Sequence, residues 1–153
     1  MSWHVYLSGE IHTEWRAEVS AAAMARRLPV EFTDPVTDHE ASDDCGVLIM
    51  GGEQNKFWHD HKGAKLNAIR TRTLIEKADI VIVRFGEKYK QWNAAFDAGI
   101  ATALGKSLIV MHQSEHAHAL KEVDAAALAV IETPEQAAEI LDYVINGVLP
   151  KAS

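Results

Sequence analysis

Short, continuous apolar runs alternate along the chain with segments in which apolar residues recur every three or four positions. A continuous apolar run is typical of a strand covered on both faces, whereas the wider spacing is typical of a helix with one buried side. The runs predict strands at 3–7, 30–33, 79–85, 107–112 and 128–131. The spaced segments predict helices at 13–28, 64–77, 92–104 and 134–145.

Two of these helices carry start signals. Thr13 is predicted to cap the first helix, with Glu14 in the first turn, where the positive end of the helix dipole favours an acidic side chain. Thr133 followed by Pro134 predicts the start of the last helix, because proline is tolerated at the first helical position.

Residues 34–62 interrupt the alternation. They are rich in Asp, Gly, His and Asn and contain one apolar run, 47–50. The pattern predicts a long loop, and a loop of this length inside a compact domain is usually either functional or a mistaken assignment of the elements. We favour the functional interpretation. We therefore expect this segment to serve a binding or catalytic site.

Strands that alternate with helices predict a single-domain α/β fold over residues 1–153. We expect a five-stranded parallel sheet with helices on both faces, which is a flavodoxin-like three-layer sandwich. Its crossovers should be right-handed. Ligands of such sheets bind beyond the carboxyl ends of the strands, so candidate chemistry is sought there.

Composition excludes several kinds of partner. The chain has 22 Asp and Glu against 15 Lys and Arg, a net charge of -7, and no basic cluster, which argues against a nucleic-acid polymer. No apolar run reaches the ~20 residues that span a bilayer, and the N-terminus does not resemble a signal peptide, so we expect no membrane partner. The single cysteine, Cys45, excludes an internal disulfide and favours a reducing compartment, which predicts a cytoplasmic protein.

Polar and small residues follow the first and third predicted strands. They are Ser8, Gly9, Glu10 and His12 after the first strand, and Phe85, Gly86 and Glu87 after the third. Gly9 allows a sharp turn and the close approach of a ligand. Titratable side chains at this edge favour a site over the alternative, a turn with solvated polar residues.

The helix at 92–104 contains an aspartate, Asp97, which shares one face with Asn93. Asp97 is either an exposed residue in a helical salt bridge or a buried carboxylate that needs a partner. Its apolar neighbours, Trp92 and Phe96 among them, favour burial. Tyr89 and Trp92 flank the preceding loop, where their rings either stack on a base or pack against the protein.

Histidines occur at metal-like spacings at His59 and His61, and at His112 and His116. However, the chain has no His-Glu-x-x-His helix and no Cys-x-x-Cys pair. Solvated loop histidines are the simpler interpretation, so we expect no metal site and no cofactor. Cys45 has no base beside it in the sequence, which argues against a thiol nucleophile.

Two blocks resemble the YtoQ family. One is Val5-Tyr6-Leu7-Ser8-Gly9-Glu10-Ile11-His12, followed by Trp15-Arg16, and the other runs from Asp79 to Gly99. The resemblance covers nearly the whole chain and includes its length.

The wider pattern is similar to the nucleoside 2-deoxyribosyltransferases at Tyr6-Leu7-Ser8-Gly9, Asp97-Ala98-Gly99 and Gly105-Lys106. In that superfamily a helix glutamate attacks the anomeric carbon, expels the base and forms a glycosyl ester, which passes to another base or to water. The resemblance also implies a site completed by a neighbouring subunit, hence a homodimer or higher oligomer. The sequence departs from the pattern at Asp97, where the enzymes have Glu, and at Gln91, where they often have Asp.

The first hypothesis is therefore an N-glycoside hydrolase or deoxyribosyltransferase that acts on a nucleoside or nucleotide. Asp97 would be the nucleophile, and Glu10 or Glu87 the general acid, with a pKa raised by burial beside a second carboxylate. The substrate-binding residues would be Ser8, Gly9, His12, Arg16, Phe85, Gly86, Tyr89, Trp92 and Asn93, with Arg16 on a 5′-phosphate. The alternatives are a non-catalytic nucleotide-binding module and, third, a hydrolase that uses the histidines to hold a metal.

Overall fold

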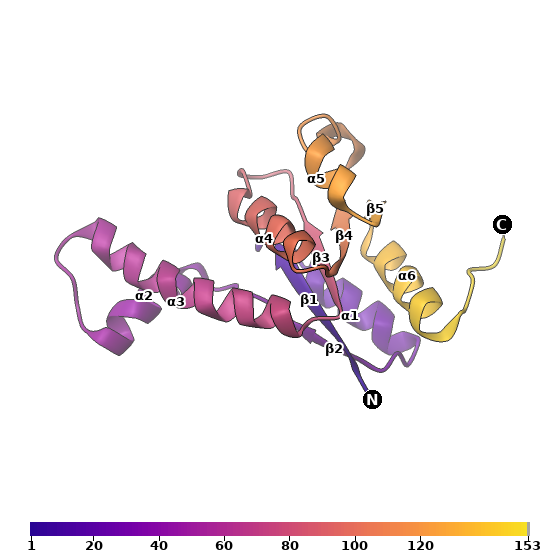
Figure 1. Ribbon diagram of the computed structural model, residues 1–153, viewed down its shortest axis with the longest axis horizontal. Coiled ribbons are helices and arrows are strands. Elements are labelled where there is room, and N and C mark those ends of the chain that lie inside the picture. Colours follow the sequence, from indigo (N-terminus) through magenta and orange to yellow (C-terminus); the bar gives the residue numbers. More distant parts are fainter. Residues whose placement is uncertain (153) are drawn as a thin grey trace.

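Five parallel strands form the central layer of the computed structural model, which describes residues 1–152 (Figure 1). The strands are β1 (Trp3–Gly9), β2 (Val30–Thr33), β3 (Ile80–Arg84), β4 (Ser107–Met111) and β5 (Ala129–Ile131). Their order across the sheet is β2-β1-β3-β4-β5, and every neighbouring pair is parallel. This is the flavodoxin-like order, so the predicted fold is confirmed.

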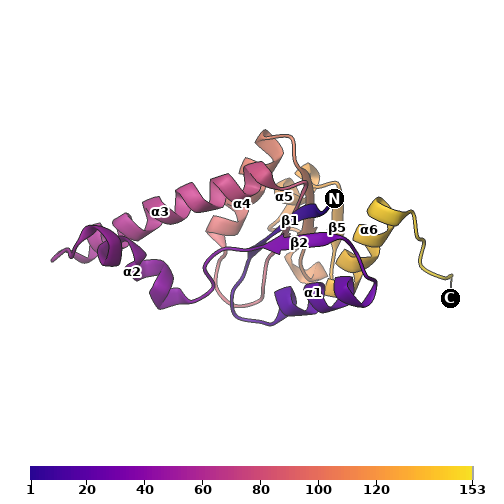
Figure 2. The same ribbon diagram turned by 90° about the horizontal axis from the view of Figure 1, so that it is seen from below.

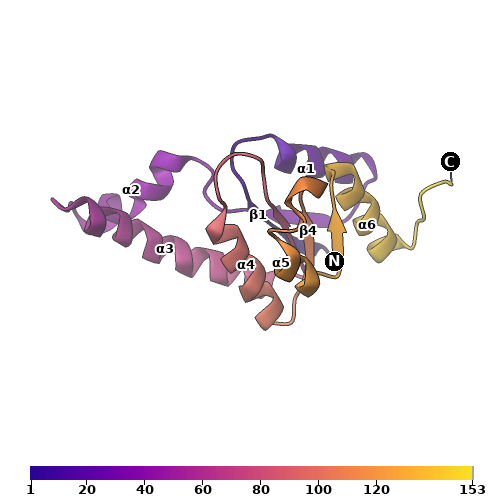
Figure 3. The ribbon, with the colours of Figure 1, turned by 90° about the horizontal axis from the view of Figure 1, so that it is seen from above.

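Helices cover both faces of the sheet, as the views from below and above show (Figures 2 and 3). They are α1 (Trp15–Ala25), α2 (His39–Met50), α3 (Lys56–Lys77), α4 (Trp92–Ala103), α5 (Lys121–Ala126) and α6 (Pro134–Asn146), with a short 3-10 turn, η1 (Ser114–His116). Helices α1 and α6 pack on one face of the sheet, and α3 and α4 pack on the other. None of the helices within residues 1–152 is long and apolar enough to cross a membrane.

Alternate residues of β1 divide the core into two halves. Val5 and Leu7 pack with Trp15 of α1 and Leu141 of α6, while Tyr6 points to the opposite face, toward α3 and α4. This follows from the period of two along a strand. All of β1 from Val5 to Ser8 is buried, as expected of a central parallel strand.

The predicted loop at 34–62 is wrong over most of its length. It contains α2 and the first turns of α3, which together form a helical hairpin that projects from the sandwich (Figure 1). Side chains of Asp38 and Asn55 cap the two helices by accepting hydrogen bonds from backbone N–H groups. Because the hairpin lies largely outside the core, α2 buries only Gly46 and α3 only Gly63 and Ile75, and the apolar periodicity that would have revealed the two helices is weak.

Two glycines set the distance between α2 and α3. A Cβ atom on Gly46 would lie 2.4 Å from the carbonyl carbon of Lys62, and one on Gly63 would lie 2.8 Å from the carbonyl oxygen of Asp43. The helix backbones therefore touch at this crossing, where only hydrogen atoms fit.

The two predicted helix starts have different outcomes. Thr133 forms a capping box with Gln136 at the start of α6, as predicted. Thr13 does not cap α1, which begins at Trp15 after Glu14 without a side-chain cap. Instead the Thr13 hydroxyl donates to the carboxylate of Glu10. The Thr13 side chain therefore belongs to the turn between β1 and α1, where its backbone amide also donates to Glu10.

Candidate functional site

A cleft of about 810 Å³ lies beyond the carboxyl end of β1, between the α2–α3 hairpin and α4. One wall is a stripe along α3, formed by Asp60, Ala64, Asn67 and Thr71, whose spacing places them on one helical face. The opposite wall comes from α4 and the loop 86–91 before it. The position agrees with the rule that places ligands at the carboxyl edge of the sheet.

Asp97 and Ser8 meet at this cleft. Ser8, buried at the end of β1, donates a 2.6 Å hydrogen bond to Oδ2 of Asp97, and Asp97 lines the cleft from the second turn of α4. Burial raises the pKa of Asp97, and the hydrogen bond from Ser8 partly offsets that rise. The burial does not come from its helical neighbours Trp92 and Phe96, which are exposed. Ser8 of β1 contacts its carboxylate, and α3 forms the facing wall of the cleft.

Tyr6 lies beneath the cleft, near Asp97 and Thr71, and sequence reasoning did not single it out. Its ring is fully buried, and burial raises the pKa of its hydroxyl to about 12, so the phenol stays protonated at neutral pH. Thr71 and Asp97 both lie close enough to shift that pKa. The hydroxyl has no hydrogen bond of normal geometry within residues 1–152. The signal available in the sequence was its place in the motif Tyr6-Leu7-Ser8-Gly9.

Glu10 is an anchor of the turn rather than an acid with a raised pKa. Burial alone would raise its pKa, but a hydrogen bond from the Thr13 hydroxyl, another from the His12 amide and the charge of Arg84 together lower it. The ion pair joins Nη1 of Arg84 to Oε1 of Glu10 at 2.7 Å, with both side chains almost fully buried. The expected rise in the pKa of Glu10 is therefore wrong.

Glu87 is exposed, and its carboxylate lies 3.6 Å from Nη2 of the same Arg84. It does not belong to the lining of the cleft. Phe85 packs into the core beneath α4, so its ring does not face a ligand. Gly86 lies against Glu10, since a Cβ there would be 2.9 Å from Cγ of Glu10.

Arg16 is bonded to the backbone of the first turn. Its guanidinium donates to the carbonyl oxygens of Leu7, Gly9 and Glu10, and its charge lies 4.7 Å from the ring centre of Trp15. Burial lowers its pKa. Because these bonds hold the carbonyl oxygens of Leu7, Gly9 and Glu10, Arg16 shapes the turn that presents Gly9 and Glu10. Its contact with a phosphate stays a prediction.

Gly9 is needed where it stands. It has a φ of +118°, and a Cβ atom would lie 2.1 Å from the carbonyl oxygen of Arg84. No side chain fits between these two strand ends. Gly9 thus lets the end of β1 pass close to the end of β3, and the chain continues to Glu10 at the edge of the cleft.

The remaining expected binding residues lie on the cleft wall. His12, Tyr89, Trp92 and Asn93 all line it. The rings of His12 and Tyr89 are 4.9 Å apart at 46°, and both Tyr89 and Trp92 are about three-quarters exposed. The structure thus places two aromatic rings and one amide within reach of a molecule in the cleft.

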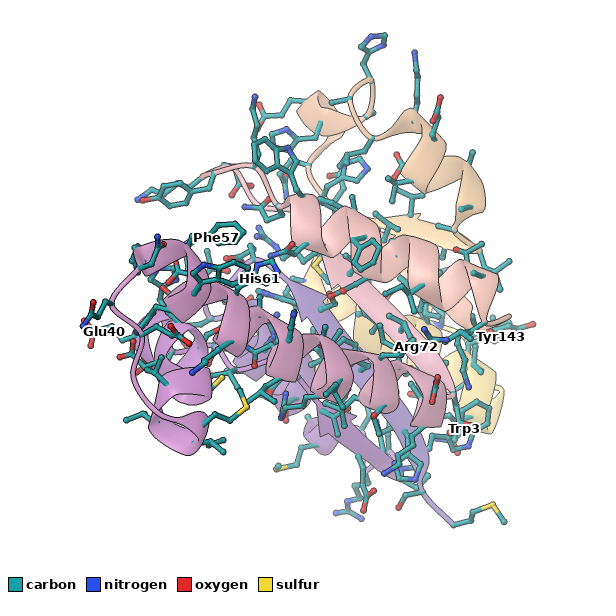
Figure 4. All side chains as sticks on the ribbon, turned by 60° about the vertical axis from the view of Figure 1, so that its left-hand side comes forward. Trp3, Glu40, Phe57, His61, Arg72 and Tyr143 are labelled. Carbon is teal, nitrogen blue, oxygen red and sulfur yellow. The ribbon has the colours of Figure 1, made fainter. Side chains whose placement is uncertain are left out.

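The histidines do not gather. His59 lies between the carboxylates of Asp44 and Asp60 on the hairpin, whereas the buried His112 at the end of β4 pairs with Asp124 of α5. Over residues 1–152 no three His, Cys, Asp or Glu side chains are arranged to hold a metal ion. Phe57 and His61 stack at 4.8 Å beside the N-terminal end of α3 (Figure 4).

The five-stranded parallel sheet and the helices that cover it are consistent with a deoxyribosyltransferase-like fold. A solved structure of the 2-deoxyribosyltransferase from the psychrotolerant bacterium Bacillus psychrosaccharolyticus is similar to the chain, with a TM-score of 0.54 and 18% identity, covering 88% of this chain and 90% of that one. This likeness shows the fold. The chain belongs to the family described as nucleoside 2-deoxyribosyltransferase YtoQ, whose model matches residues 6–145.

A relative from Bacillus subtilis (strain 168), the uncharacterized protein YtoQ, is 44% identical over 146 residues, which are 95% of this chain and 99% of that protein. The resemblance that residues 5–12 and 79–99 carry is thereby confirmed. The roles of the individual residues stay predictions.

Proposed function

We propose that the chain cleaves the N-glycosidic bond of a nucleoside or nucleotide and transfers the sugar to water or to a second base, with Asp97 as the nucleophile. The observation that carries this proposal is the pairing of Asp97 with Ser8 inside a cleft at the strand ends. The printed description of the family, nucleoside 2-deoxyribosyltransferase, supports the substrate class.

The reaction takes two displacements. An oxygen of Asp97 attacks the anomeric carbon, the carbon–nitrogen bond breaks, and its electron pair leaves with the base, which gains a proton. Water or a second base then attacks the same carbon and releases Asp97 as a carboxylate, so the configuration is retained. Ser8 holds Oδ2 of Asp97 and thereby orients Oδ1 for the attack. The raised pKa of Asp97 makes its carboxylate more basic and more nucleophilic.

The proton for the leaving base comes from solvent in this proposal. Glu10 is held ionised by Arg84 and by hydrogen bonds, and Glu87 is exposed beside the same arginine. Neither carboxyl is arranged to donate a proton into the cleft. The cleft is open, so water reaches the departing nitrogen.

Substrate contacts follow from the walls of the cleft. Tyr89 and Trp92 receive the planar base against exposed rings, a contact worth ~1–3 kcal/mol per base in other stacking sites. Asn93, one turn before Asp97 on the same helix, holds a sugar hydroxyl. His12 faces the Tyr89 ring from the β1–α1 turn.

We further propose a homodimer or higher homo-oligomer. The hairpin exposes large apolar side chains at its free end: Leu48, Ile49, Met50, Phe57 and Trp58. Exposed apolar groups gathered on one element are typical of a contact surface. Light scattering after size exclusion tests this, with Trp58→Ala expected to lower the mass of the assembly.

Trapping the sugar on the protein tests the mechanism. After rapid acid quench of a reaction with 2′-deoxynucleosides, the intact mass should rise by one deoxyribosyl group, on the peptide that contains Asp97. Asp97→Asn should carry no adduct. An adduct on another carboxylate would transfer the nucleophilic role to that residue.

A second candidate function is a nucleotide-binding module without turnover. It is favoured by the shorter carboxylate at position 97 and by Gln91 where the similar enzymes often have Asp. It predicts thermal stabilisation by nucleosides or nucleotides with no release of base. The two functions are thus separated by one chromatographic assay.

A further inference from the structure

The Gln91 side chain bridges the loop that leads into α4. Its Oε1 accepts a 3.1 Å hydrogen bond from the Gly86 amide, and its Nε2 donates to the carbonyl oxygen of Lys88. Gln91 stands at the N-cap position of α4, yet its side chain makes no cap bond to the helix. A primary amide both donates and accepts, whereas an ionised carboxylate only accepts, so neither Asp nor Glu could make both contacts.

Tyr89 lies inside the bridged turn in a left-handed conformation, with a φ of +61°. For a residue other than glycine this conformation costs roughly 1–2 kcal/mol and persists only where its surroundings impose it. Tyr89 lies between the bonded residues in the sequence, because Gly86 and Lys88 precede it and Gln91 follows it. The ring of Tyr89 then stands against His12 at 4.9 Å, although three-quarters of the residue is exposed.

We propose that Gln91 is a positioning residue, whose bridge to Gly86 and Lys88 fixes the turn so that the Tyr89 ring forms, with His12, the wall of the cleft that receives the substrate's planar base. The identity of the ligand rests on the proposed function. The position of the wall does not, because it follows from contacts within the free protein.

The free protein provides the first test. In Gln91→Ala the Gly86 amide loses its acceptor, so its hydrogen-exchange rate measured by NMR should rise about 3- to 10-fold, and the proton contacts between His12 and Tyr89 should weaken. Gln91→Glu should keep Gly86 protected, since the acceptor remains, but it loses the donor to Lys88, so the ring contact should weaken less than in Gln91→Ala. Tyr89→Gly is the matched control: glycine accepts the positive φ, so Gly86 exchange should not change.

The second test uses 2′-deoxyadenosine and thymidine as probes, with base release as the readout. Gln91→Ala and Tyr89→Gly should both raise KM about tenfold and leave kcat nearly unchanged, because the wall contributes to binding rather than to the reacting atoms. Gln91→Glu should lie between wild type and Gln91→Ala.

The outcomes separate the two proposals. If wild-type protein releases no base from these probes or from any other nucleoside or nucleoside monophosphate, the proposed function is contradicted, and Gly86 exchange with the His12–Tyr89 contacts still decides the role of Gln91. Unchanged exchange and ring contacts in Gln91→Ala would overturn that role. A lower kcat at constant KM would also overturn it, because Gln91 would then act on the reacting atoms. Altered exchange with an unchanged KM would show that the wall does not receive the base.

Discussion

The Ser8 hydroxyl donates a 2.6 Å hydrogen bond to the Asp97 carboxylate across 89 positions of sequence. The parallel order of β1 and β3 makes this meeting possible, because both strands end at the same edge of the sheet and α4 begins shortly beyond β3. The hydrogen bond lowers the pKa of Asp97 against the larger effect of burial, which raises it. Ser8 therefore sets how much of Asp97 is ionised at a given pH.

Ser8→Ala should move the acid limb of the pH–rate profile to higher pH. Without the hydroxyl, burial acts on Asp97 unopposed, so its pKa rises further and less of the carboxylate is available as a nucleophile. We therefore expect base release by Ser8→Ala to fall below that of wild type on the acid side of the profile and to approach it as the pH rises. Ser114→Ala, on the exposed turn η1, is the control. A limb that moves to lower pH would contradict the assignment.

Asp97→Asn should be more stable than wild type at pH 7. A carboxyl whose folded-state pKa is raised favours folding when it is protonated, and this contribution is lost as pH rises through the folded value. The asparagine keeps an oxygen for Ser8 and carries no charge. Urea unfolding should therefore show a stability gain for Asp97→Asn at pH 7 that disappears below the unfolded value of about 3.9. A constant difference at every pH would mean that ionisation of Asp97 is not the cause.

The close crossing of α2 and α3 predicts that replacing Gly63 by alanine has the opposite effect on stability to replacing Gly99. Gly63→Ala should destabilise the protein by about 1–3 kcal/mol, because its new methyl group would meet the backbone of Asp43. Gly99→Ala, within α4 with nothing near its Cβ, should instead stabilise by roughly 0.5–1 kcal/mol. Both values come from the midpoint of urea unfolding. Equal effects would contradict the close contact of the hairpin helices.

The Glu10–Arg84 pair should support folding rather than proton transfer. Arg84→Met leaves Glu10 buried without its partner and should cost about 3–5 kcal/mol, most of which Glu10→Gln should restore in the double variant. Because the pKa of Glu10 is lowered in the folded state, this contribution is present above the unfolded value of ~4.3 and is lost as pH falls through the folded value. If Arg84→Met had the same urea midpoint of unfolding as wild type at pH 7, the pair would not stabilise the fold.

The sequence was sufficient for the sheet and for the edge where the site lies. Continuous apolar runs such as 80–83 mark buried parallel strands independently of the rest of the chain. The rule on the carboxyl ends of strands then selected Ser8, Glu10 and the segment that leads to Asp97. The prediction of the sheet succeeded because it depends on local burial and on topology alone, whereas the roles of the residues at its edge stay predictions.

What could not be predicted depends on contacts between distant residues. Glu10 was expected to be a proton donor because burial raises a carboxyl pKa, but Arg84 lies beside it across the strand ends and reverses the sign. Likewise, Gly46 and Gly63 lie in a segment with little apolar periodicity. The sequence pattern therefore predicts a loop where the structure has the α2–α3 hairpin. The pKa of Glu10 and the form of the hairpin both depend on contacts between residues far apart in the sequence.

The central claim is that Asp97 carries out N-glycoside chemistry, and base release tests it most directly. Wild type, Asp97→Asn and the control Gly99→Ala, on the same helix, would be incubated with a panel of nucleosides and nucleoside monophosphates, and free base measured by chromatography. We predict release from at least one substrate by wild type and Gly99→Ala, and none by Asp97→Asn. Release by Asp97→Asn at the wild-type rate, or by no protein from any substrate, would contradict the account.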